Sequence, residues 1–130
     1  VQAAAVHALS RDDPLSPAAP LLNYRQLGVY RLLLPLIGQE TLGQYAGGIL
    51  EPILEFDAEN RGNLLETLLH LVRCGGDLHM LARYTGQHEN TLRNRLERIR
   101  GLTGLNYRHP GHYEELALAA RIYLLRNVEG

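Results

Sequence analysis

Residues 88–100, HENTLRNRLERIR, gather side chains that can bind nucleic acid. An arginine can donate two hydrogen bonds to guanine, and an asparagine can pair with adenine through both of its amide groups. Threonine and further arginines can hold phosphates, which positions a protein on a duplex without reading its sequence. The candidate base contacts are Asn90, Thr91, Arg93 and Asn94; the candidate phosphate contacts are Arg95, Arg98 and Arg83; and His88 could reach either a base or a phosphate.

Apolar residues in the same segment predict the element that carries these side chains. Leu92, Leu96 and Ile99 recur at positions i, i+4 and i+7, which gives a helix one narrow buried face. We therefore expect a helix from Glu89 to about Arg100, with the basic and amide side chains on its flanks and opposite face. A solvated surface helix would carry similar side chains, because an acid and an arginine four residues apart form an ordinary pair.

The preceding residues predict the first helix of a helix-turn-helix motif. Gly75–Gly76 stops the helix before it, and Asp77 is placed to cap a short helix over Leu78–Tyr84. Two closely crossing helices need a small residue at their contact, which Ala82 supplies. Gly86 supplies a turn residue that tolerates a positive φ. Because residue type and spacing agree at each of these positions, they strengthen the DNA-binding interpretation, and a merely solvated helix remains the alternative.

Charge is distributed unevenly along the chain. The net charge is −1 over 130 residues, and all 13 basic residues are arginine. Residues 1–72 carry four arginines and eight acids, residues 73–108 carry seven and three, and residues 109–130 carry two and three. The middle segment therefore has a net charge of +4, between segments of −4 and −1. This distribution favours a nucleic-acid face.

The remaining segments predict an all-α fold. A broad apolar stripe of five leucines and a valine covers residues 64–72. A final helix at residues 112–127 directs one face inward, made of Leu116, Ala119, Ala120, Tyr123 and Leu124. Residues 39–56 predict two short helices or one kinked helix, because Gly47–Gly48 and Pro52 interrupt the pattern.

The first 36 residues are less regular. Residues 2–10 predict a short helix, and the three prolines of residues 11–20 predict a loop. In the apolar run that follows, Leu21–Tyr24 could form a strand and Val29–Leu34 a buried helix, which short runs do not decide. The sequence begins at Val1 without methionine, so we expect a longer parent protein. No apolar run reaches the length of about 18 residues that a membrane helix needs.

Other reactive side chains favour no second chemistry. His109 and His112 lie close together, but no carboxylate or cysteine joins them at a spacing typical of metal sites. The single cysteine, Cys74, suits a reducing cytosol and is expected in the core. No nucleophile elbow, phosphate loop or dinucleotide motif is present. We therefore expect neither an enzyme nor a bound metal or cofactor.

Residues 60–126 resemble the C-terminal helix-turn-helix of PucR-type (purine catabolism regulator) bacterial transcription factors and the similar domain of carbohydrate diacid regulators. The resemblance rests on the pattern HxNTLxxRLxRI followed by LTGL, on LLETL at residues 64–68, and on Gly76 and Ala82. It implies a Fis-like four-helix domain that binds double-stranded DNA as a homodimer in the cytoplasm. It also implies control of catabolic genes by an effector metabolite that another part of the parent chain senses.

Upstream, YRQLGVYRLLLPL resembles the tail of the degenerate GGDEF-like domain that precedes this module in the family. We therefore predict a sensor-domain remnant and linker at residues 1–36, a helical connector at 37–57 and the DNA-binding domain at 58–130. Within residues 39–56, four apolar residues could pair two chains: Ile49, Ile53, Leu54 and Phe56.

Several residues depart from the family pattern. Thr85 and Gln87 stand where apolar residues usually pack the turn, so the core there is expected to be looser. Glu89 stands where a basic residue is frequent, and it would either repel phosphate or accept a hydrogen bond from cytosine. These departures keep open an alternative, an oligomerisation and signal-relay module that has lost DNA binding.

Overall fold

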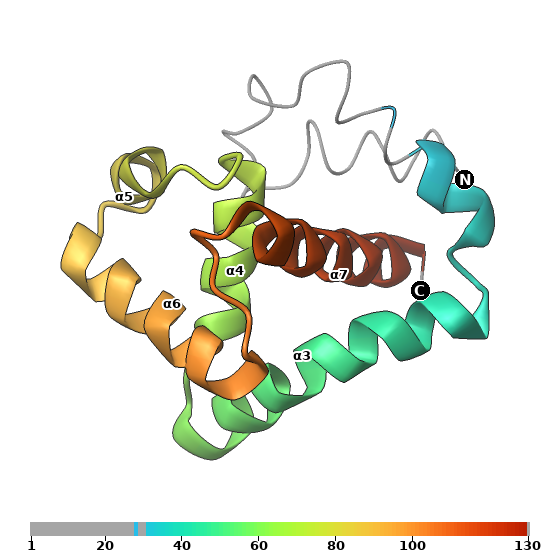
Figure 1. Cartoon of the computed structure of the whole chain (residues 1–130), viewed down its shortest axis with the longest axis horizontal. Coiled ribbons are helices and arrows are strands. Elements are labelled where there is room, and N and C mark those ends of the chain that lie inside the picture. Colours follow the sequence, from blue (N-terminus) through green and yellow to red (C-terminus); the bar gives the residue numbers. More distant parts are fainter. Residues whose placement is uncertain (1–27, 29–30, 130) are drawn as a thin grey trace.

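The structure, a computed structural model, describes residue 28 and residues 31–129, and these are arranged as helices without a strand (Figure 1). The all-α prediction is therefore confirmed for the described residues. The elements are the 3-10 turn η3 (Leu34–Leu36) and the helices α3 (Glu40–Asn60), α4 (Leu64–Arg73), α5 (Leu78–Thr85), α6 (Glu89–Thr103) and α7 (Pro110–Glu129). The helix predicted at residues 2–10 and most of the predicted GGDEF-like remnant lie outside the described residues.

Helix α3 is one continuous helix of 21 residues that passes through Gly47–Gly48 and Pro52. It packs against α4, α6 and α7, and it runs across the predicted boundary between residues 57 and 58. Its buried residues Ala46, Leu50 and Ile53 belong to the same core as those of α4 and α7. Because Ile53 is fully buried inside this chain, the interpretation that it pairs two chains is wrong; Leu54 keeps 41 % of its surface exposed.

Helix α4 is the centre of this core. All six apolar residues of its predicted stripe are buried, with Leu68 and Leu71 fully so. The helix contacts α3, α5, α6 and α7, so the other helices are placed relative to one another through it (Figure 1). Since burying one leucine side chain stabilises a fold by about 1.5–3 kcal/mol, this stripe supplies much of the driving force for assembly.

The two helices of the predicted motif end in the same way. In α5 the Thr85 hydroxyl donates to the Leu81 carbonyl at 2.9 Å, and in α6 Thr103 donates to Ile99 at 2.8 Å. The next residue is a glycine in the left-handed region, with φ of 73° at Gly86 and 78° at Gly104. Side chains carry a steric cost there, so the Thr-Gly pairs fix where both helices stop.

The first turn of α4 is capped from α3. The Asp57 carboxylate accepts from the backbone N–H groups of Leu64 at 2.9 Å and Leu65 at 3.0 Å. The residue at the N-cap position, Asn63, makes no side-chain cap bond. A carboxylate at this end of a helix also interacts favourably with the helix dipole. Asp57 therefore fixes the angle between α3 and α4.

We predict that Asp57→Ala lowers the free energy of unfolding by about 1–2 kcal/mol, because two N–H groups lose their acceptor. Urea denaturation followed by circular dichroism measures the change. Glu55→Ala, which removes an exposed acid from the same helix, is the control and should change stability much less. Equal losses in the two variants would contradict the role of Asp57.

Candidate nucleic-acid interface

Helices α5 and α6 form a helix-turn-helix whose rotation is fixed by buried side chains. Leu81 of α5 is fully buried, and Leu92, Leu96 and Ile99 of α6 keep at most 2 % of their surface exposed. The Asp77 carboxylate caps α5 by accepting from the Met80 N–H at 3.0 Å. These features confirm the predicted apolar face, the cap and the turn. Because one face of α6 is held against the core, its opposite face must point to solvent.

Four of the predicted contacts lie on that outer face: Asn90, Thr91, Asn94 and Arg98 are exposed. Within the described part of the chain, the side chains of Thr91 and Asn94 have no hydrogen-bond partner. The side-chain oxygen Oδ1 of Asn90 accepts from Arg93 Nη1 at 3.0 Å, and its amide N–H₂ group has no partner among the described residues. The structure thus presents two amide side chains and a hydroxyl along one solvent-facing row.

Arg93 lies on the flank of α6 that faces α5. Its Nη2 is 3.6 Å from Glu89 Oε1, and it shares a shallow groove of about 460 Å³ with residues from both helices. The described lining of this groove consists of His79, Ala82, Arg83, Gln87, His88, Glu89, Asn90 and Arg93. The predicted residues Arg83, His88, Asn90 and Arg93 are therefore brought together at the motif turn.

His88 forms the N-cap of α6. Its Nδ1 atom accepts from the Asn90 N–H at 3.0 Å, while the residue itself stays exposed. An accepting Nδ1 in a neutral imidazole places the ring proton on Nε2. The geometry therefore leaves an N–H donor beside the first turn of the helix, where a phosphate or a base acceptor could meet it.

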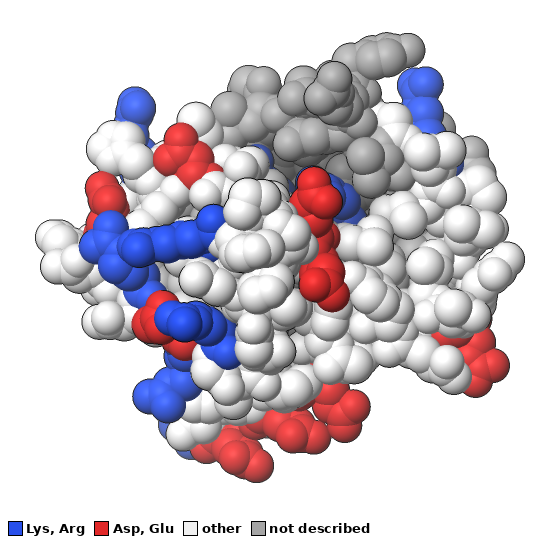
Figure 2. Space-filling model, in the orientation of Figure 1, with Lys and Arg blue, Asp and Glu red and all other residues white. Residues whose placement is uncertain are grey.

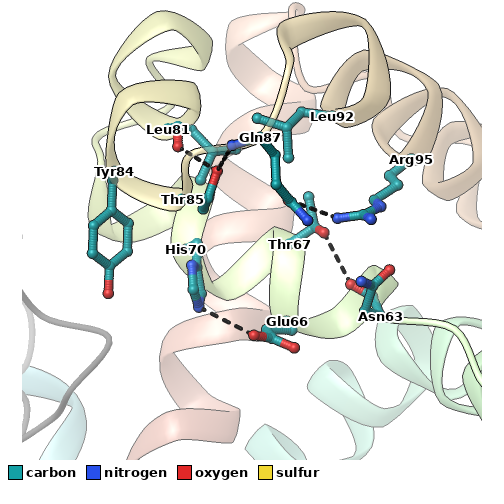
Figure 3. A pocket seen from close by; sticks show the side chains of 10 residues that line it. All are labelled: Asn63, Glu66, Thr67, His70, Leu81, Tyr84, Thr85, Gln87, Leu92 and Arg95. Carbon is teal, nitrogen blue, oxygen red and sulfur yellow. Dashed lines mark hydrogen bonds and ion pairs between the residues drawn. The ribbon is translucent and has the colours of Figure 1, made fainter.

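Arg95 differs from the exposed predicted contacts because its side chain is directed toward Gln87 in a pocket (Figure 3). It is half-buried, and its Nη1 donates to Gln87 Oε1 at 2.8 Å. Both residues line a polar pocket of about 250 Å³ between α4, α5 and α6. For Arg95 to reach a phosphate, it must leave or share its hydrogen bond with Gln87.

The same pocket explains two departures from the family pattern. Besides donating to Leu81, the Thr85 hydroxyl accepts from the Gln87 N–H at 3.2 Å. The Gln87 side chain is paired with Arg95. Since a buried polar group is costly chiefly when it is unpaired, these bonds remove the reason to expect a loose core at the turn.

Arg98 stands where α6 meets α3. Its guanidinium carbon lies 5.3 Å from the centre of the Phe56 ring, a distance at which a cation is attracted to the aromatic face. Asn94 and Arg95 line the same shallow hollow. No local pattern predicts this contact, because residues 56 and 98 belong to helices far apart along the chain.

Charges of both signs cover the surface of α6 (Figure 2). The arginines form a cluster over this helix, and acids lie between them. Glu97 Oε1 is 3.0 Å from Arg100 Nη1, and Glu89 Oε2 is 3.1 Å from His79 Nδ1 on α5. Pairing of this kind lowers the net positive field over α6, so the field that an approaching anion meets comes mainly from the side chains that remain unpaired.

The other reactive residues have structural roles. Cys74 is buried, and burial, aided by the nearby Asp77 carboxylate, raises the pKa of its thiol. His109 Nδ1 accepts from the His112 N–H at 3.3 Å, and His112 Nδ1 accepts from the Asn106 N–H at 3.2 Å. No group of three possible metal ligands occurs among the described residues. None of the helices within residues 31–129 combines the length and apolar character needed to span a membrane.

Together, the capped and crossed α5–α6 pair and the exposed amide side chains of α6 define a helix-turn-helix module. Residues 64–122 match the family model of the PucR C-terminal helix-turn-helix domain, and this part of the chain is a PucR-type domain. This family indicates a DNA-binding regulator in general terms. Neither a curated protein nor a solved structure matches the chain.

The hydrogen bonds of the turn give a stability prediction. Thr85→Val keeps the shape of the side chain but removes the bonds to Leu81 and Gln87, so the free energy of unfolding should fall by about 1 kcal/mol. Thermal or urea unfolding measures it. The control is Thr41→Val at an exposed position of α3. If the two variants are equally stable, the Thr85 hydroxyl does not support the turn.

Proposed function

We propose that this chain is the DNA-binding part of a sequence-specific transcriptional regulator and that α6 enters the major groove. The observation that carries this proposal is the outer row Asn90, Thr91 and Asn94 on a helix whose other face is locked in the core. Amide side chains in this position can pair with adenine edges, which is direct reading of sequence. The match to a PucR-type helix-turn-helix supports the same function.

The proposed contacts fall into two groups, base contacts and phosphate contacts, according to their place on the helix-turn-helix. Asn90, Thr91, Asn94 and Arg93 contact base edges, because the N-terminal part of a recognition helix lies deepest in the groove. The proposed phosphate contacts are Arg98, Arg83 and His88 around the rim, together with Arg95 once it leaves Gln87. Such contacts set the position of the helix and supply salt-dependent affinity.

The wider assembly follows from the same proposal. A Fis-like domain of this kind would act as a homodimer, so that two copies of α6 read two half-sites about one helical turn apart. We propose that residues 58–130 form the DNA-binding domain and that residues 37–57 connect it to a sensor region of the parent protein. An effector bound there would control transcription in the bacterial cytoplasm.

The alternative, a relay module without DNA binding, is favoured by the internal pairing of the basic residues. Arg93 is paired with Glu89, and Arg95 is bonded to Gln87. The α3 contact of Arg98 would serve a relay equally well. The two functions differ in their response to salt and to the DNA sequence, which the following experiments use.

Binding to duplexes from upstream of the parent operon should weaken steeply as salt rises, because phosphate contacts release counterions. Arg98→Ala should reduce the slope of log affinity against log salt concentration by about one. Fluorescence anisotropy measures both. Arg126→Ala is the control, since this arginine lies beside Gly43, far from Phe56 along α3. A slope that Arg98→Ala leaves unchanged removes this residue from the phosphate contacts.

Asn94→Ala should weaken binding to the specific site by about 1–3 kcal/mol and leave binding to random DNA nearly unchanged. Competition between operator and random duplexes measures this difference. Asn127→Ala, at an exposed position near the end of α7, is the matched control. Equal binding to operator and random DNA, unaffected by Asn90→Ala, would favour the relay module.

A further inference from the structure

Glu89 has a carboxylate that is held from two sides. Its Oε2 atom is 3.1 Å from His79 Nδ1 on α5, and its Oε1 atom is 3.6 Å from Arg93 Nη2 one turn along α6. The side chain keeps 39 % of its surface exposed. The carboxylate therefore has a defined direction and remains accessible at the mouth of the groove between the two helices.

The position of Glu89 is that of a base-reading residue. It is the first residue of α6, and in helix-turn-helix proteins the N-terminal residues of the second helix contact base edges. It is the one acid among the described residues that line the groove, where Arg83 and Arg93 are the arginines. These cations offset the repulsion between a carboxylate and the phosphates, so an acid can approach the duplex here.

A purely local role does not account for this arrangement. An acid in the first turn favours a helix by facing its positive end, and backbone N–H groups are then its natural donors. Here the described partners of both oxygens are side chains, one of which comes from the neighbouring helix. The crossing of α5 and α6 therefore orients the Glu89 carboxylate. A fixed orientation of this kind suits an acceptor that binds a donor on another molecule.

We propose that Glu89 is a specificity-determining residue that accepts a hydrogen bond from the N4 amino group of cytosine in the major groove. This inference rests on the proposed DNA-binding function. In the groove, guanine presents two acceptors and thymine presents an acceptor and a methyl group, so both are unfavourable next to a carboxylate. Adenine offers an amino donor, but its neighbouring N7 acceptor repels the second oxygen. Cytosine is the base that fits.

His79 is a positioning residue in this scheme. Its Nδ1 contact directs one carboxylate oxygen and leaves the other near the groove. Removing the His79 side chain leaves the negative charge of Glu89 in place, but the Glu89 side chain can then turn to other directions. His79→Ala should therefore lower the preference for cytosine while general affinity changes little.

The test is selection of bound duplexes from a randomised DNA pool, followed by affinity measurements with each of the four bases at the affected position. The unaltered chain should select cytosine at one position of each half-site, by about tenfold or more over guanine and thymine. Glu89→Gln should lose this preference or shift it to adenine, the base that an amide pairs with. Glu97→Gln is the matched control, because it also removes one acid from α6, at an exposed position paired with Arg100.

The possible results distinguish a failure of cytosine recognition by Glu89 from a failure of the proposed DNA-binding function. A cytosine preference that Glu89→Gln abolishes and Glu97→Gln retains supports the inference. If all three proteins select the same motif, the chain reads DNA but Glu89 does not read a base, and the inference is overturned alone. If the unaltered chain binds no duplex sequence in preference to another, sequence-specific binding and the inference are both overturned.

Discussion

The burial of Leu92, Leu96 and Ile99 in the core is the constraint on which the rest of the structure depends. Three apolar side chains on one line allow α6 only one rotation about its own axis. That rotation decides which residues face water and which face α5 or α3. The polar surface of α6 is therefore a consequence of its apolar side, and a change in the core would redirect every side chain proposed to meet DNA.

The elements were largely predictable because their signals are local. A helical spacing of leucines, an aspartate before a helix and a glycine after one act within a few residues. The all-α fold and the two helices of the motif follow from such signals. Local signals do not decide whether α3 continues through Pro52, because its packing against α7 competes with the local preference of proline.

The partners of the site residues were less predictable. The pairs Gln87–Arg95 and His79–Glu89 join residues eight and ten positions apart across a turn, and Phe56–Arg98 joins two distant helices. Each pair depends on a crossing angle and a side-chain direction that a spacing pattern does not contain. Residue types therefore indicate the candidate contacts. The packing of the helices decides which of these side chains face solvent and which are bonded to other residues of the chain.

Helix α3 gives the fold a further property. Its residues Ala46, Leu50 and Ile53 are buried in the common core, the helix packs against α7, and Asp57 caps the first turn of α4. A chain shortened to begin at residue 58 would keep every residue proposed to touch DNA. It would, however, expose the apolar surface of α7 that α3 packs against. Such a fragment would tend to self-associate through this surface. The shortest fragment that folds as a monomer therefore extends beyond the helix-turn-helix and includes α3.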